Sequence, residues 1–120
     1  MKLLLGAAAT LSTALAADIG TPGLVLLARH KDGEPLRTAS AIPGSPAAKA
    51  RIPPAGFLIS VNSTNVVSMS LTQALSMVRG TPGTSVVLEI ADATMRHTNK
   101  FTLKRGRLVH SLNRLEVIEP

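Results

Sequence analysis

The sequence has no cysteine, tryptophan or tyrosine, and only two phenylalanines among its 120 residues. Without cysteine, the chain can form no disulfide, thiolate nucleophile or cysteine-ligated zinc site. Metal ligands are limited to carboxylates and the three histidines His30, His97 and His110, and no two of these histidines have the spacing of ligands on one helix. We therefore expect neither a metalloenzyme nor a bound cofactor.

The charge balance is moderately basic, with 13 Lys and Arg against 7 Asp and Glu and a formal net charge of +6. Nucleic-acid platforms usually add aromatic side chains on which bases stack, and this chain has only Phe57 and Phe101. We interpret the late basic residues as solvated strand faces and hairpin tips, not as a surface for nucleic acid or anionic lipid. These residues are Arg96, Lys100, Lys104, Arg105, Arg107 and Arg114.

The N-terminus has the layout of a secretory signal peptide. Lys2 precedes an apolar stretch over residues 3–15, and the small residues Ala14 and Ala16 form an Ala-x-Ala cleavage signal. The stretch is shorter than the roughly 20 residues that cross a bilayer. We expect cleavage of residues 1–17, a periplasmic or secreted protein, and no stable membrane insertion afterwards.

The rest of the chain suits one domain and is too short for a two-domain enzyme. Short apolar runs predict strands, and the Asp32-Gly33 pair predicts a hairpin turn between the first two. Asn62 to Asn65 predict a turn after the third strand, and the last two strands are expected to pair across Asp92. The predicted strands are Leu24–Ala28, Leu36–Ala41, Phe57–Val61, Ser85–Ile90 and Thr98–Leu103.

Two helices are expected between these strands. Ser45 can cap a one-turn helix over Pro46–Ala50, with proline at the first position. A longer helix over Leu71–Arg79 begins with a capping box of Ser70 and Gln73, and Gly80 is expected to end it in a left-handed conformation. The element order predicts a mostly antiparallel sheet or partly open barrel with two helices.

Catalytic motifs are absent from the sequence. It contains no Gly-x-Ser-x-Gly nucleophile elbow and no glycine-rich phosphate loop with its lysine. Glu89 and Asp92 lie at a strand end and its turn, where solvated carboxylates are ordinary. We therefore expect a protein that is not an enzyme and has no catalytic residues.

Binding of an extended peptide fits the pattern better. A strand that follows a glycine-containing turn beside an amphipathic helix can accept a peptide as an added strand, and turn N–H groups can hold its carboxylate. On periodicity alone, an equally valid interpretation assigns the apolar positions to the core. They are Leu24, Leu26, Leu71, Leu75 and Val78.

Residues 19–107 resemble a PDZ domain of the kind found in bacterial carboxy-terminal processing proteases. The resemblance rests on an ordered series of motifs that spans nearly the whole chain after the signal peptide. The motifs are Gly23-Leu24-Val25-Leu26, Asp32-Gly33, Pro43 to Ala50, Phe57 to Asn62, Met69-Ser70-Leu71, Arg79-Gly80, Pro82-Gly83-Thr84, Val86 to Ile90 and Phe101 to Arg105.

The resemblance implies a five- or six-stranded partly open antiparallel barrel with two helices over residues 18–107, followed by a tail or extra strand over 108–120. By position, Gly23, Leu24, Val25 and Leu26 correspond to the carboxylate-binding loop and groove strand. Leu71, Leu75 and Val78 correspond to groove-facing helix positions. Family members that prefer Ser or Thr two residues before the ligand terminus often have His at the first helix position. Here that position is Leu71, so the resemblance implies an apolar ligand residue there.

The sequence departs from the family pattern at three places. Val25 replaces the second glycine of the loop, and Arg51 stands where glycine often follows the short helix. Ala55 and Gly56 replace the glycine and aspartate of the usual Pro-Gly-Asp turn.

The expected function is that of an exported, stand-alone, non-catalytic module that binds protein C-termini or extended peptides by strand addition. Two alternatives remain open at this stage. One is a structural or assembly module of a secretion or protease complex, and the other is a truncated regulatory relative of a processing protease.

Overall fold

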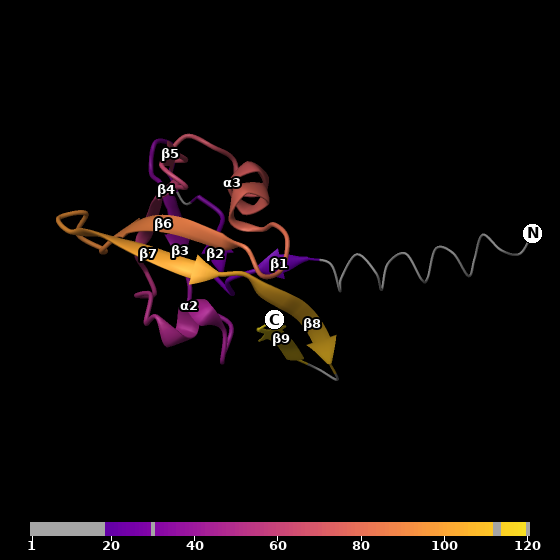
Figure 1. Cartoon of the computed structure of the whole chain (residues 1–120). Coiled ribbons are helices and arrows are strands. Elements are labelled where there is room, and N and C mark those ends of the chain that lie inside the picture. Colours follow the sequence, from indigo (N-terminus) through magenta and orange to yellow (C-terminus); the bar gives the residue numbers. More distant parts are fainter. Residues whose placement is uncertain (1–18, 30, 112–113, 120) are drawn as a thin grey trace, which may run out of the picture.

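The computed structural model describes residues 19–29, 31–111 and 114–119 and shows a mostly β fold (Figure 1). The predicted signal peptide lies outside the described residues. The elements, in chain order, are β1 (Gly20–Thr21), β2 (Leu26–Leu27), β3 (Leu36–Thr38), α2 (Pro46–Lys49), β4 (Phe57–Val61), β5 (Thr64–Asn65), α3 (Leu71–Val78), β6 (Ser85–Ala91), β7 (Thr98–Lys104), β8 (Gly106–Ser111) and β9 (Arg114–Ile118).

Two antiparallel sheets make up the fold. The larger sheet has the strand order β2-β3-β4-β6-β7, with β5 paired to β4, and the smaller has the order β1-β8-β9. In Figure 1, α3 and α2 lie at opposite ends of the larger sheet, and the β8–β9 hairpin projects beyond the end of β7. The predicted class, a mostly antiparallel sheet with two short helices, is confirmed.

The local predictions explain most elements. Strand β4 has the predicted bounds, and β6 and β7 pair in register from Ser85 and Lys104 to Ala91 and Thr98. Gly33 has a φ of 86° in the hairpin between β2 and β3, which is why glycine suits that turn.

The first predicted strand is shorter than expected and only partly buried. Only Leu26 and Leu27 form β2, and the Leu27 side chain is 48% exposed. An apolar run of this kind suggests a strand buried on both faces, but Leu26 and Leu27 point to opposite faces and only Leu26 contacts the core.

The core lies between the larger sheet and the helices. Ala74 and Val78 of α3 and Ala47 of α2 are fully buried against it. The largest fully buried side chains come from the strands and the loop before α3. They are Leu36, Leu58, Leu88, Ile90, Val61 and Val66.

The N-cap of α2 and the capping box of α3 form as the sequence predicts. Ser45 Oγ accepts from the Ala48 N–H at the start of α2. At α3, Ser70 Oγ accepts from the Gln73 N–H at 3.1 Å and Gln73 Oε1 accepts from the Ser70 N–H at 3.0 Å. These bonds satisfy N–H groups that have no partner within the helix.

The end of α3 differs from the prediction. Arg79 follows the helix in an extended conformation, with φ −82° and ψ 160°, and Gly80 does not have a positive φ. Gly80 instead pairs with Gly20 through two backbone bonds of 2.8 and 2.9 Å. A Cβ on Gly80 would lie 2.8 Å from Arg105 Cζ, so glycine is needed here for space and not for a left-handed cap.

Arg105 explains that close contact. Its Nε donates to the Val78 carbonyl at 2.9 Å and its Nη2 to the Met77 carbonyl at 3.1 Å. Its Nη1 donates to Thr84 Oγ1 and to the Ser85 carbonyl. The side chain is 8% exposed, and its burial lowers the arginine pKa. Arg105 therefore acts as an internal clamp, which corrects its assignment to a solvated basic face.

The departures from the family pattern are accommodated by the backbone. Arg51 and Ala55 both adopt positive φ, at 58° and 64°. Gly56 does not have a positive φ, but a Cβ there would lie 2.6 Å from the Ala91 carbonyl oxygen. The turn thus places an alanine where the backbone favours glycine, and a glycine where a side chain has no room.

In the part of the chain that the structure describes, no helix combines the length and apolar character needed to cross a bilayer. Within the same residues, no group of three or more histidines and carboxylates is placed to hold a metal ion.

The Arg105 clamp can be tested by substitution. Arg105→Met should lower the free energy of unfolding by about 2 to 3 kcal/mol, because buried carbonyls at the end of α3 lose a charged donor. Denaturant unfolding measures this change. Arg107→Met removes an exposed charge two residues away and should change stability by less than about 0.5 kcal/mol. Equal effects of the two substitutions would contradict the clamp.

Candidate functional site

The candidate groove lies between β2 and α3. The carbonyl of Val25 accepts from the Ala39 N–H at 2.9 Å, and Leu26 is paired with Thr38. In an antiparallel ladder, alternate residues direct their backbone groups to opposite edges, so the N–H and C=O of Leu26 face away from β3. Among the described strands, none pairs with this edge of β2. The edge is a template for an added strand.

The loop before β2 is held in shape by Gly23. This residue has a φ of 89°, and its N–H donates to Thr21 Oγ1 at 3.1 Å. A Cβ on Gly23 would lie 2.2 Å from the Ser45 side chain, so both conformation and space require glycine. Val25 does not have a positive φ, so a branched side chain is compatible with its backbone. Within the described ranges, the N–H groups of Leu24 and Val25 donate to no protein acceptor.

A pocket of about 210 Å³ opens at this end of the groove. Its lining combines four of the predicted site residues with five others. The lining residues are Thr21, Leu24, Val25, Leu26, Ile42, Leu75, Arg79, Leu108 and Leu115.

The structure brings together only some of the predicted site residues. Leu24, Val25, Leu26 and Leu75 line the pocket, and Gly23, Leu71 and Val78 do not. Gly23 shapes the loop, Leu71 is partly buried in the first turn of α3, and Val78 is sealed in the core. We keep the groove assignment of Leu71 as a prediction, because α3 places it one turn before Leu75.

The sequence reasoning missed the other lining residues for different reasons. Arg79 follows Leu75 by four positions, which puts both on one side of α3, so helical spacing was a usable signal. Leu108 and Leu115 come from β8 and β9, and the register of those strands beside the loop depends on tertiary packing.

The chemistry of the pocket is apolar with hydrogen-bond donors at one end. Among the lining residues that the structure describes, none is Asp or Glu. The donors are the guanidinium of Arg79, the hydroxyl of Thr21 and the N–H groups of Leu24 and Val25, which have no acceptor in the described ranges. Such an arrangement suits a ligand that has an apolar side chain next to an anionic group.

Comparisons of the sequence with known proteins identify the family of the domain. A family model described as PDZ domain matches residues 37–92. The carboxy-terminal processing protease CtpA of Bacillus subtilis is 43% identical over 86 residues, which make up 72% of this chain and 18% of that protease. The chain contains a PDZ domain related to bacterial carboxy-terminal processing proteases.

Solved structures share the fold of this PDZ domain. The photosystem II D1 C-terminal processing protease superposes with a TM-score of 0.73 at 22% identity, over 84% of this chain and 26% of that one. The PDZ domain of a carboxy-terminal protease from Vibrio cholerae, solved in complex with peptide, gives a TM-score of 0.63 at 20% identity, over 73% of this chain and 94% of that one. Only a PDZ domain is evident in the 120 residues, and no catalytic domain is found.

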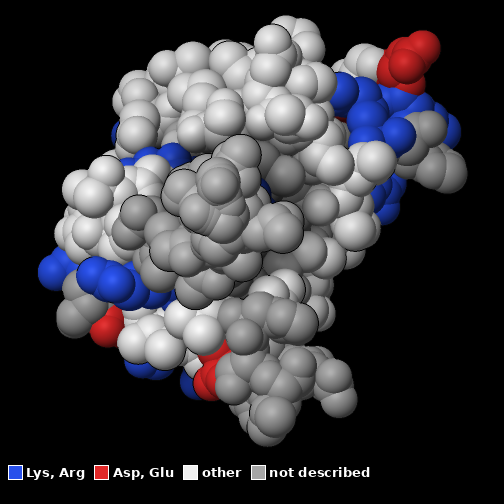
Figure 2. Space-filling model, turned by 90° about the vertical axis from the view of Figure 1, so that its right-hand side faces the viewer, with Lys and Arg blue, Asp and Glu red and all other residues white. Residues whose placement is uncertain are grey.

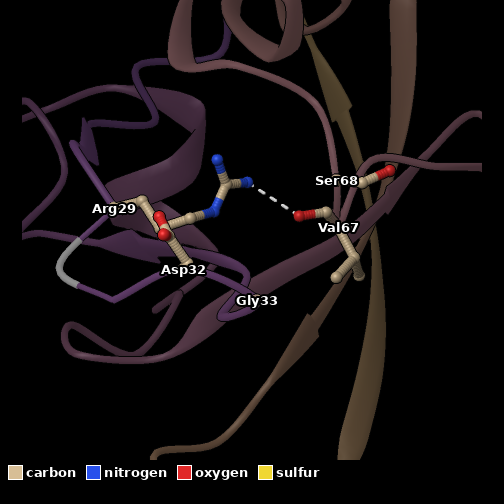
Figure 3. A pocket seen from close by; sticks show the side chains of 5 residues that line it. All are labelled: Arg29, Asp32, Gly33, Val67 and Ser68. Atoms are coloured by element: carbon tan, nitrogen blue, oxygen red, sulfur yellow. Dashed lines mark hydrogen bonds between the residues drawn. The ribbon is translucent and has the colours of Figure 1, made fainter.

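Arg29 lies at the wall of a second pocket, of about 230 Å³, next to Asp32, Val67 and Ser68 (Figure 3). Its Nη2 donates to the carbonyls of Val67 and Met69, both at 2.7 Å, and its Nε donates to the Glu34 carbonyl. These bonds connect the β2–β3 hairpin to the segment before α3. Because its Nε and Nη2 groups donate to three backbone carbonyls, we assign Arg29 a structural role.

Basic side chains of the PDZ domain do not form one continuous field on the face shown in Figure 2, where they gather mainly at two edges. Lys100 and Lys104 lie four residues apart on the same exposed face of β7, and Arg96 and Arg107 are also exposed. The side chain of Arg114 lies outside the described residues. Apart from Arg105, the late basic residues that the structure describes are solvated, as the sequence predicts.

Proposed function

We propose that this PDZ domain binds the free C-terminus of a protein or extended peptide that ends in an apolar residue, and that it does so without catalysis. The observation that carries the proposal is the edge of β2, which no described strand pairs with and which leads into an apolar pocket with donors and, among its described lining residues, no Asp or Glu. The Vibrio cholerae PDZ domain of the same fold was solved in complex with peptide, which supports the assignment.

The proposed binding mode is strand addition. The ligand backbone pairs with the outward N–H and C=O of Leu26, and its carboxylate approaches the free N–H groups of Leu24 and Val25. The last ligand side chain enters the apolar pocket against Leu75, and Leu71 favours an apolar residue nearer the start of α3. Each contact uses a backbone group or an apolar surface, so the binding tolerates variation in the ligand's remaining sequence.

A peptide screen tests this function directly. Fluorescent peptides with varied last residues are titrated with the full chain, each as the free acid and as the C-terminal amide. Peptides that end in Leu, Ile, Val or Phe should bind, and amidation should weaken binding at least tenfold, because the loop donors lose an anion. Equal binding of acids and amides, or no binding at all, would contradict the proposal and favour a structural or assembly role.

A substitution in the pocket separates groove from core. Leu75→Lys should abolish peptide binding while lowering stability by less than about 2 kcal/mol, because Leu75 is only partly buried. Val78→Lys is the matched control on the same helix. It places an unpaired charge in a fully buried position and should unfold the domain. Unfolding caused by Leu75→Lys would assign Leu75 to the core, and intact peptide binding would exclude it from the site.

We also propose that the chain is exported and acts in the periplasm or outside the cell. The support is the cation, apolar stretch and Ala-x-Ala signal within residues 1–17. Mass spectrometry of the protein from its native host should find an N-terminus at Ala17 or Asp18. Recovery of a chain that still begins with Met1-Lys2 would contradict export by this route.

A further inference from the structure

Among the described residues that line the pocket, Arg79 is the one that carries a charge. It directly follows α3, and its N–H donates to the Leu75 carbonyl at 2.9 Å. This bond fixes the Arg79 backbone one turn beyond Leu75, on the side of the helix that faces the loop before β2. The side chain is exposed, so the cation keeps contact with solvent at the mouth of an apolar pocket.

A role for Arg79 in stabilising the end of α3 does not account for this position. A cation near a helix C-terminus usually interacts with the last carbonyls. Here the carbonyls of Met77 and Val78 already accept from Arg105. The two ion pairs among the described residues are Arg37 with Glu34 and Lys49 with Glu119, so the Arg79 guanidinium has no acidic partner there.

The other anion donors at this site are limited. Val25 stands where the family has the second glycine of the loop, and its Cβ restricts the backbone in a way that glycine would not. The loop offers the N–H groups of Leu24 and Val25, and a guanidinium beside them adds a planar pair of charged donors that matches the geometry of a carboxylate.

We infer that Arg79 binds the terminal carboxylate of the ligand from the helix side, opposite the backbone N–H groups of the loop. This inference rests on the proposed function and adds a charged specificity determinant to it. With Arg79, the preference of the site for a free acid over an amide depends partly on an ion pair. Backbone donors alone supply no such pair. Because the guanidinium is exposed to solvent, salt should weaken this part of the discrimination.

The experiment measures the ratio of amide to free-acid dissociation constants for one apolar-ended peptide, with the full chain and its Arg79→Gln variant. The variant should bind the free acid about tenfold more weakly and the amide within twofold of the original chain. Between 50 mM and 500 mM salt, the ratio of amide to free-acid dissociation constants should fall for the original chain and change little for the Arg79→Gln variant. Arg79→Lys keeps a charge without the planar donor pair and should show an intermediate ratio.

Arg96→Gln is the matched control, since it removes the same charge from the exposed turn between β6 and β7 and should leave the ratio unchanged. If Arg79→Gln leaves the ratio unchanged, whether both affinities stay the same or both fall by the same factor, the role of Arg79 is overturned while peptide binding stays established. Failure of the original chain to bind any free acid would instead overturn the proposed function. Denaturant unfolding of each variant verifies that the fold is retained, and Arg79→Lys decides the question if the glutamine variant unfolds.

Discussion

The guanidinium of Arg105 is the interaction on which the placement of α3 depends. It joins the last carbonyls of the helix to Thr84 and Ser85 at the start of β6. An arginine suits this position because its planar group presents several donors at once to acceptors on different segments. The same group occupies the space beside Gly80, where the chain pairs with Gly20. One side chain thus fixes the helix end, the turn after it and the approach of the first strand.

The opposite wall of the groove depends on a close contact between glycine and serine. Gly23 lies against Ser45, which is fully buried and caps α2. The short helix therefore supports the loop that faces the ligand, and the Ala47 N–H donates to the Pro22 carbonyl at 2.8 Å to strengthen the contact. The loop and the long helix are held by separate parts of the fold, which leaves the space between them open to a ligand.

Local sequence patterns correctly predicted the features that depend only on interactions within a few residues. The capping box of Ser70 and Gln73 and the turn at Gly33 follow from side chains and backbone preferences within a few residues. The end of α3 was mispredicted because Gly80 responds to a neighbour distant in sequence, Arg105, whose burial no local pattern indicates.

In the candidate site, too, some residues could be predicted from the sequence and others are placed only by tertiary contacts. Leu24 and Leu75 were found through the resemblance and through helical spacing. Leu108 and Leu115 reach the pocket only through the pairing of β8 with β1 and with β9. Such contacts depend on the assembled fold, and a single sequence without an alignment contains little information about them. The family match itself spans residues 37–92, so it includes neither the loop nor the hairpin.

The pocket is therefore lined by residues from both the beginning and the end of the described chain. Its walls come mainly from the segment that leads into β2, from the end of α3 and from the β8–β9 hairpin. A fragment limited to the matched residues would contain Ile42, Leu75 and Arg79 but lack the other lining residues. Sites built from contacts of such long sequence separation form late, since the chain entropy of closing a large loop is lost before the cavity exists. A ligand that occupies the cavity binds only the native arrangement, and by linkage it stabilises the closure of the whole domain.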